Sequence, residues 1–308
     1  MQILTKIEKK HHLVGHKDCI YALAKTDPTQ YLFSADGNGM VARWNLENPE
    51  IGELVAKVPN SVYAMQYDEE EKQLIIAQNF EGIHWINLQE KKEEKSLYLG
   101  NKNFFALQKH HQFLYVGDSE GTLSLIDSAE KKLLKTVQYS TKSLRALALN
   151  PKKKEIAAAY SDHHIRLLDC DTLQIKKEWK AHENSVFCLQ YTKDGQYLLS
   201  GSRDAHLNIW NAEKDYFLEK SIVAHLFAIN HIAISPSGKY FATASMDKSI
   251  KIWRIDSWQL LKVIDRARHA GHGTSINQLL WTDYQGYLIS ASDDRTLSVW
   301  EIAFAKAE

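Results

Sequence analysis

Short runs of alternating apolar and polar residues fill this chain, and polar turns, many with glycine, separate the runs. Residues 186–191, 197–200 and 207–210 show the pattern within one segment. A two-residue period places successive side chains on opposite faces of an extended strand. No stretch carries a long apolar stripe at helical spacing. The pattern therefore predicts an all-β protein built from many short strands.

The strand pattern repeats along the chain. The segment "NSVFCLQYTKDGQYLLSGSRDAHLNIWNA" (184–212) returns as "FAINHIAISPSGKYFATASMDKSIKIWRI" (227–255) and as "TSINQLLWTDYQGYLISASDDRTLSVWEI" (274–302). Four weaker copies precede them, starting at residue 18. One aligned position anchors all seven copies at intervals of 41 to 47 residues, and it holds Trp44, Trp85, Ile126, Leu168, Trp210, Trp253 and Trp300. A period near 40 residues with four short strands is typical of a propeller blade.

A histidine near the start of the unit and a tryptophan in its third strand make the chain resemble the WD-repeat (Trp-Asp repeat) family over essentially its whole length. The aspartate after the tryptophan is mostly replaced here. The resemblance implies one seven-bladed β-propeller over residues 1–308, with four antiparallel strands per blade. The expected blades are 14–57, 58–98, 99–139, 140–180, 181–223, 224–268 and 269–308. Because only eight residues follow Trp300, residues 1–13 are expected to add the outer strand of the last blade and to close the ring.

Histidine, hydroxyl and aspartate side chains occur together in the last three units, which raises the hypothesis of a hydrolase triad. A triad occurs once per active site, whereas this set recurs in register. The resemblance implies instead a buried chain in which the indole donates to the hydroxyl, the hydroxyl to histidine, and histidine to aspartate. The expected sets are His182, Ser200, Asp204 and Trp210; His225, Thr243, Asp247 and Trp253; and His272, Ser290, Asp294 and Trp300.

The first four units depart from this quartet. Unit one keeps His16, Ser34 and Trp44, with Asn38 at the aspartate position. Units two to four lack the histidine and the hydroxyl, so we expect that part of the ring to be less braced. Trp85 must then find another acceptor for its indole N–H.

The family's geometry also implies a partner-binding surface on the top rim, the edge formed by the loops that enter each first strand and the turns that join second to third strands. The candidate residues are Tyr21, Tyr63, Phe105, Arg145, Phe187, Arg203, Asn230, Met246, Arg268, Asn277 and Asp293. Aromatic and arginine side chains dominate binding hot spots because they offer large, rigid contact areas. The alternative is that some of these aromatics pack between blades.

The composition of the chain argues against several classes of function. Lys+Arg and Asp+Glu both number 38, so no global field attracts nucleic acid or a membrane surface. Three cysteines without a CxxC pair are expected to be free thiols in a reducing cytoplasm. The histidine pairs lack a third ligand, so neither a metal nor another cofactor is expected.

The leading hypothesis is therefore a non-catalytic scaffold that binds protein or peptide segments on its top rim, as a monomeric propeller within a larger assembly. One alternative is an enzyme or small-ligand binder that uses the central channel. Another is a reader of acidic or phosphorylated peptides through the rim arginines, which include Arg145, Arg203, Arg266 and Arg268.

Overall fold

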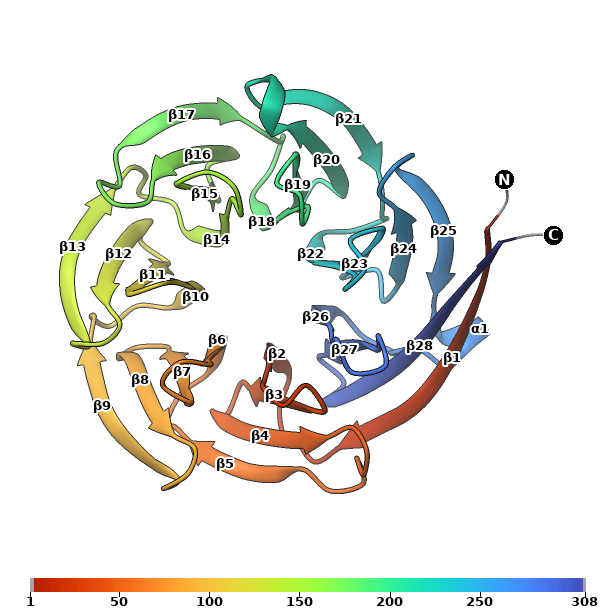
Figure 1. The fold of residues 1–308 in the computed structure, drawn as a ribbon, viewed down its shortest axis with the longest axis horizontal. Coiled ribbons are helices and arrows are strands. Elements are labelled where there is room, and N and C mark those ends of the chain that lie inside the picture. Colours follow the sequence, from red (N-terminus) through yellow and green to blue (C-terminus); the bar gives the residue numbers. More distant parts are fainter. Residues whose placement is uncertain (1–2, 307–308) are drawn as a thin grey trace.

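Seven β-sheets stand around a central axis in the computed structural model, which describes residues 3–306 and the side chains of residues 5–304 (Figure 1). Each sheet has four antiparallel strands, so the prediction of an all-β, seven-bladed propeller is confirmed. Helix in the described range is limited to the four-residue α1 (Arg266–His269) and the 3-10 turn η1 (Ala212–Lys214). No helix among these residues has the length and apolar character needed to cross a bilayer.

Blades 1 to 6 each use four consecutive strands, ordered from the axis outward. Blades 1 to 3 contain β2 (Ile20–Lys25), β3 (Tyr31–Asp36), β4 (Met40–Asn45) and β5 (Glu53–Lys57); β6 (Val62–Asp68), β7 (Gln73–Gln78), β8 (Gly82–Asn87) and β9 (Lys92–Tyr98); and β10 (Phe104–His110), β11 (Phe113–Asp118), β12 (Thr122–Asp127) and β13 (Lys132–Gln138). Blades 4 to 6 contain β14 (Leu144–Leu149), β15 (Glu155–Tyr160), β16 (His164–Asp169) and β17 (Ile175–Lys180); β18 (Val186–Tyr191), β19 (Tyr197–Ser202), β20 (His206–Asn211) and β21 (Phe217–Val223); and β22 (Ile229–Ile234), β23 (Tyr240–Ser245), β24 (Ile250–Arg254) and β25 (Gln259–Ile264).

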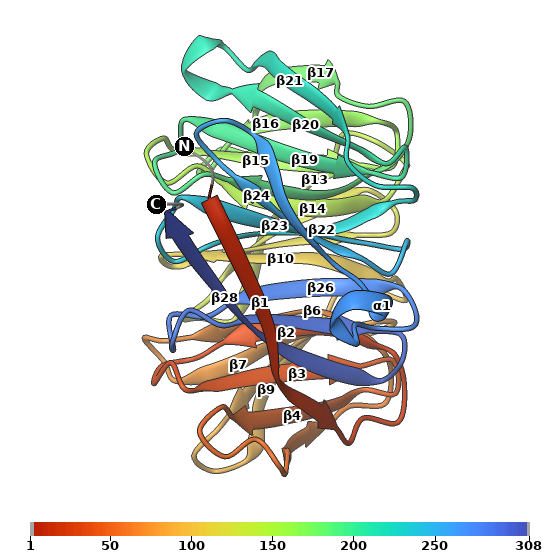
Figure 2. The ribbon, with the colours of Figure 1, turned by 90° about the vertical axis from the view of Figure 1, so that its right-hand side faces the viewer.

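Blade 7 joins the two ends of the chain. Its sheet runs β26 (Ile276–Trp281), β27 (Leu288–Ser292), β28 (Thr296–Lys306) and β1 (Ile3–Val14) from the axis outward. The first strand thus closes the ring, as the sequence predicts. Figure 2 shows β1 beside β28, with both termini at one edge of the disc and α1 near the other. The edge with α1 is the top rim, because α1 lies in the loop that enters β26.

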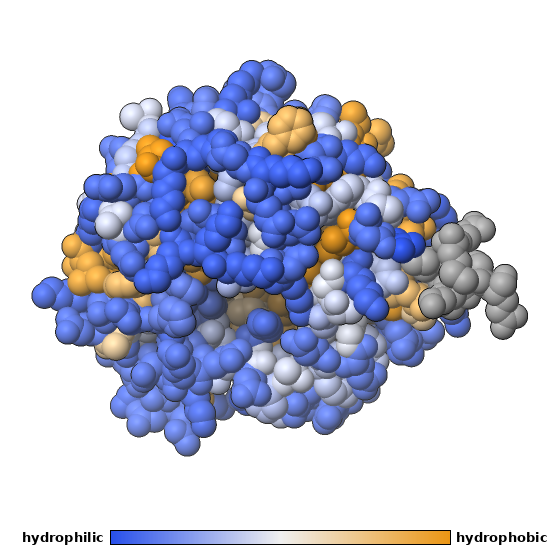
Figure 3. Space-filling view, turned by 45° about the horizontal axis from the view of Figure 1, so that its top comes forward, coloured by the Kyte–Doolittle hydropathy of each residue, from blue (hydrophilic) through white to orange (hydrophobic). Residues whose placement is uncertain are grey.

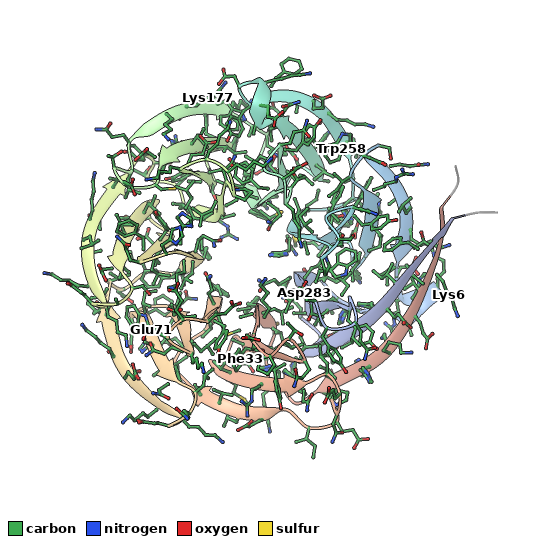
Figure 4. All side chains as sticks on the ribbon, in the orientation of Figure 1. Lys6, Phe33, Glu71, Lys177, Trp258 and Asp283 are labelled. Carbon is green, nitrogen blue, oxygen red and sulfur yellow. The ribbon has the colours of Figure 1, made fainter. Side chains whose placement is uncertain are left out.

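The hydrophobic core is divided into seven layers, each between two adjacent blades. Between blades 7 and 1, for example, Ile289 and Val299 pack against Leu32 and Trp44. Both faces of every blade are therefore buried. The side chains of the inner strands leave the centre of the ring open (Figure 4). The central hollow is bordered mainly by hydrophilic residues on the face toward the viewer in Figure 3.

The quartets of blades 5 to 7 form the same buried chain. In blade 5, Trp210 Nε1 donates to Ser200 Oγ (2.9 Å), that hydroxyl lies 2.8 Å from His182 Nε2, and His182 Nδ1 lies 3.2 Å from Asp204 Oδ2. Burial opposes ionisation of Asp204, but the hydrogen bond and charge of His182 outweigh it and keep the pKa of Asp204 below its ordinary value. The chain ties the loop before each blade to its second and third strands. Blades 6 and 7 repeat it through His225, Thr243, Asp247 and Trp253 and through His272, Ser290, Asp294 and Trp300.

Blade 1 builds this chain with a different acceptor from the one expected. His16 Nδ1 lies 2.9 Å from Asp36 Oδ2, while Asn38 is exposed, so the assignment of Asn38 to the network is wrong. Asp36 ends β3 two residues earlier, and its other oxygen accepts the backbone N–H groups of Asn38 (3.0 Å) and Met40 (2.9 Å). A carboxylate at the start of the turn therefore binds the histidine and the turn together.

Blades 3 and 4 replace the quartet with ion pairs. Lys102, in the loop before blade 3, places its Nζ 3.1 Å from Asp118 Oδ2. In blade 4, Arg166 bridges Asp162 (2.9 Å) and Glu178 (2.7 Å). Lys102 thus ties the loop before blade 3 to the end of its second strand, whereas the ion pairs of Arg166 lie within blade 4; the expectation that blades 2 to 4 are less braced stays a prediction.

The assignment of Trp85 to the anchor position of blade 2 is wrong. Leu74 pairs with Ile86 as Leu32 pairs with Trp44 and Leu198 with Trp210, so blade 2 has the common register and Ile86 holds that position. Successive residues of a strand point to opposite faces. Trp85 accordingly packs toward blade 3, and its indole N–H has no acceptor among the described residues.

Candidate functional site: the central funnel

A β-bulge interrupts the inner strand of every blade near the top rim. In each case one residue of the inner strand has no partner on the second strand, and a bulge of this kind re-aims the extra side chain. The seven extra residues are Tyr21, Tyr63, Phe105, Arg145, Phe187, Asn230 and Asn277. Together they line a cavity of about 630 Å³ at the mouth of the channel, here called the funnel. Met246 and Asp293, also expected on the top rim, line it too.

The side chains of the bulge residues of blades 1 to 5 contact one another in series. The Tyr21 ring meets the Tyr63 ring edge-on at 4.7 Å, and the Tyr63 ring stacks on Phe105 at 5.6 Å between centroids. The Arg145 guanidinium carbon lies 4.1 Å from the Phe105 centroid and 4.8 Å from that of Phe187. Contacts of this type hold the rings in fixed orientations. These side chains therefore pack against their neighbours in adjacent blades and also line the funnel.

Amide side chains continue the ring in blades 6 and 7. Asn230 Nδ2 donates to Ser275 Oγ (3.0 Å) and to the Ile276 carbonyl (2.9 Å). Asn277 Nδ2 donates to Asp293 Oδ1 (2.7 Å) and to the carbonyl of Ile20 in blade 1 (3.0 Å). This half of the funnel is polar, and its hydrogen bonds cross from each blade to the next.

Arg145 is the one cationic side chain of the funnel wall. Its guanidinium makes no hydrogen bond or ion pair with any residue of the described part of the chain. Burial lowers the pKa of Arg145, yet a guanidinium stays protonated in proteins. The funnel thus contains a stacked positive charge without a protein counter-ion.

The funnel wall also contains a histidine. Burial lowers the pKa of His231 in the funnel wall to about 4, so this imidazole is neutral at pH 7, and its Nδ1 accepts the Leu279 N–H at 3.4 Å. Across residues 3–306 there is no group of three or more side chains able to hold a metal ion.

Two of the candidate rim residues lie outside the funnel. Arg268 is in α1, where its guanidinium Nε donates to Asp265 Oδ2 at 2.9 Å. Arg203 is exposed in the turn between β19 and β20. The arginines expected to form a basic face are thus not gathered in one place, and only Arg145 borders the cavity.

An apolar patch on blade 6 was missed by the sequence analysis. Leu226 is 83% and Phe227 61% exposed in the loop that enters β22, and Met246 is 50% exposed in the turn after β23. The Met246 N–H donates to the Ala228 carbonyl (3.0 Å), which holds loop and turn together. These three residues are called the blade 6 patch, and Met246 connects them to the funnel. The matching loop positions are polar or glycine in blades 1, 5 and 7, and this contrast is visible in the sequence: Lys17 and Asp18, Glu183 and Asn184, Gly273 and Thr274.

The chain is similar to several curated WD-repeat relatives. It is 23% identical over 300 residues to WD repeat-containing protein 1 of Gallus gallus, which covers 94% of this chain and 48% of that protein. It is 24% identical over 176 residues to nuclear distribution protein PAC1 of Arthroderma benhamiae, and this alignment covers 54% of this chain and 37% of PAC1. It is 22% identical over 276 residues to striatin-3 of Mus musculus, and this alignment covers 80% of this chain and 34% of striatin-3. The chain thus spans about half the length of these relatives or less.

A family match covers most of the propeller. Residues 49–303 match the family described as "Nucleolar protein 10-like, N-terminal domain", whose members form a β-propeller. This range includes blades 2 to 6 and most of blade 7. The chain therefore belongs to the nucleolar protein 10-like N-terminal domain family of WD-repeat β-propellers.

Proposed function

We propose that this protein is a non-catalytic interaction propeller that binds a protein segment on its top rim, across the funnel and the blade 6 patch. The observation that carries the proposal is the exposure of Leu226 and Phe227 beside a funnel of pre-positioned aromatic and arginine side chains. Exposed apolar groups next to a rigid concavity are typical of protein-binding sites. Similarity to WD-repeat proteins supports the same class of function.

The burial of the quartets supports a non-catalytic role. Ser200, Thr243 and Ser290 are each 0% exposed, and each hydroxyl already contacts an indole and an imidazole. A nucleophile needs room for its substrate, which these positions lack. The quartets brace the scaffold, and the top rim is left for binding.

The test compares two rims of the same molecule. The double variant Leu226→Asp with Phe227→Asp places charge on the blade 6 patch, and Ile51→Asp does so at an equally exposed apolar residue (84%) in the turn between β4 and β5 on the opposite rim. We expect the double variant to reduce the recovery of co-purifying proteins at least about tenfold, by quantitative mass spectrometry, while Ile51→Asp leaves it unchanged.

A second variant probes the funnel itself. Replacing Tyr63, Phe105 and Phe187 together with alanine should also abolish partner recovery while thermal melting shows a folded protein. Full recovery of partners by both the patch variant and the funnel variant would refute binding on the top rim.

A further inference from the structure

We propose that Arg145 makes the funnel selective for a partner segment that carries an aspartate or glutamate, whose carboxylate pairs with the Arg145 guanidinium while adjacent apolar residues cover the blade 6 patch. This inference rests on the proposed function and names the chemistry of the segment.

The contacts of Arg145 leave its N–H donors open for a ligand. The guanidinium carbon lies 4.1 Å from the centre of the Phe105 ring and 4.8 Å from the centre of the Phe187 ring. The N–H donors of a guanidinium lie along the edge of a planar group, and contacts with aromatic rings satisfy none of them. No acceptor from residues 3–306 meets them, although the side chain lines the cavity. A carboxylate can accept two parallel N–H bonds at such an edge.

The surroundings of Arg145 strengthen this pairing. The guanidinium is partly desolvated by its two aromatic neighbours, so a counter-ion meets less competition from water than it would on an open surface. The stack also holds the side chain in place before binding, which reduces the conformational entropy lost when the partner docks.

The charge of the funnel wall favours a single carboxylate over a phosphate. Arg145 supplies one positive charge, and the other formally charged residue of the wall is Asp293 of blade 7. A phosphorylated residue brings close to two negative charges, and a nucleic acid needs a row of cations. One carboxylate neutralises Arg145 without excess charge near Asp293.

The blade 6 patch supplies the second part of the specificity. Met246 borders the funnel, and Leu226 and Phe227 extend the apolar surface outward along the rim. A segment with its acidic side chain at Arg145 therefore meets apolar surface next to it. The matching ligand is an acidic residue close to one or more bulky apolar residues.

The test is a selection from a random peptide library displayed on phage, with the full chain as bait. We expect the wild-type protein to enrich peptides that combine Asp or Glu with apolar residues. Binding of a selected peptide should weaken at least about tenfold with Arg145→Gln, and equally when its acidic residue is changed to the amide. The two changes together should cost little more than either alone, because they remove the same contact.

Control variants separate this inference from the proposed function. Selected peptides without acidic residues, or equal affinity for wild type and Arg145→Gln, would overturn the role of Arg145 and leave top-rim binding standing. A phosphoserine peptide that binds more tightly than its glutamate counterpart would overturn the choice of a carboxylate. If no peptide is selected, or if the Leu226→Asp and Phe227→Asp variant selects the same peptides, the proposed function fails as well. Should Arg145→Gln not fold, Arg145→Lys and the peptide amide still test the contact.

Discussion

At the residue scale, one structural task is performed by different side chains in different blades. In the blades braced in this way, a buried group connects the loop before the blade to the end of its second strand or to the turn that follows, and its buried polar atoms need hydrogen-bond partners. Histidine with aspartate does this in blades 5 to 7, and Lys102 with Asp118 in blade 3. Asp36 replaces the expected Asn38 because a carboxylate at the end of β3 reaches His16 and also caps the turn. The sequence spacing in blades 5 to 7, where the aspartate follows the hydroxyl residue by four positions, pointed to Asn38 and so did not identify Asp36.

The Asp36 assignment predicts unequal effects of two alanine substitutions. Asp36→Ala should lower the free energy of unfolding by about 2–3 kcal/mol at pH 7, because His16 and two backbone N–H groups lose their acceptor. Asn38→Ala, at an exposed position, should change it by less than about 0.5 kcal/mol. Urea denaturation measures both, and a larger effect at Asn38 would contradict the assignment.

The same variant should change the pH dependence of stability. Burial opposes ionisation of Asp36, but the hydrogen bond and charge of His16 together with the backbone N–H groups of Met40 and Asn38 outweigh it and lower the pKa of Asp36 in the folded protein. Its stabilising effect is then present above the unfolded pKa of about 3.9 and is lost as pH falls below it. As the pH is lowered from 5 until Asp36 is protonated, the free energy of unfolding should therefore fall more in wild type than in Asp36→Ala.

At the element scale, local departures from regular pairing decide which side chains reach the site. The bulge in each inner strand turns one residue per blade into the funnel, so the seven-membered ring depends on seven irregularities of the same kind. In blade 2, the common register of β7 and β8 places Ile86 at the position that faces blade 1, and Trp85 points to the other face. Pairing between strands thus decides which of two neighbouring residues faces a given blade.

The orientation of Trp85 predicts that two tryptophans respond differently to the same substitution. Trp44→Phe removes the indole that donates to Ser34 Oγ at 2.7 Å, whereas the Trp85 indole N–H has no acceptor among residues 3–306. Both changes remove similar apolar volume from buried sites. Trp44→Phe should therefore destabilise the protein by about 1–3 kcal/mol more than Trp85→Phe. Equal losses in chemical denaturation would contradict the assigned register.

At the scale of the whole molecule, stability depends on ring closure. Each apolar layer needs both of its blades, so an incomplete blade weakens the layers on either side of it. β1 completes blade 7 by pairing along β28, and Ile7 packs with Ile302 against the layer between blades 6 and 7. The rigidity of the funnel therefore depends on a strand at the opposite end of the sequence from the rest of its blade.

Deletion of residues 1–9 tests this closure. The deletion exposes the edge of β28 and part of the blade 6–7 layer, so the melting temperature should fall by at least about 5 °C. Lys6→Ala, an exposed change on the same strand, should leave melting unchanged. A truncated protein that melts like wild type would show that β1 does not hold the ring.

The sequence by itself determined the architecture and much of the bracing. The period of about 40 residues and the alternation within it depend on neighbouring residues, so they predict strand number, blade number and closure by the N-terminal strand. The quartets of blades 5 to 7 repeat at constant spacing, and their residues are the ones that the structure brings into contact. The seven bulge residues also form one column of the repeat, because each lies at the same distance from the start of its unit, and their role in binding stays a prediction.

The tertiary structure decided which side chains meet. The acceptor of His16 and the ion pairs of Lys102 and Arg166 each depend on a turn or a contact that sequence spacing does not define. The contacts of Arg145 with the Phe105 and Phe187 rings join three adjacent blades, and Arg268 is paired with Asp265 instead. Such contacts are set by packing between residues far apart in the chain, and for that reason the binding surface emerged only when the ring was closed.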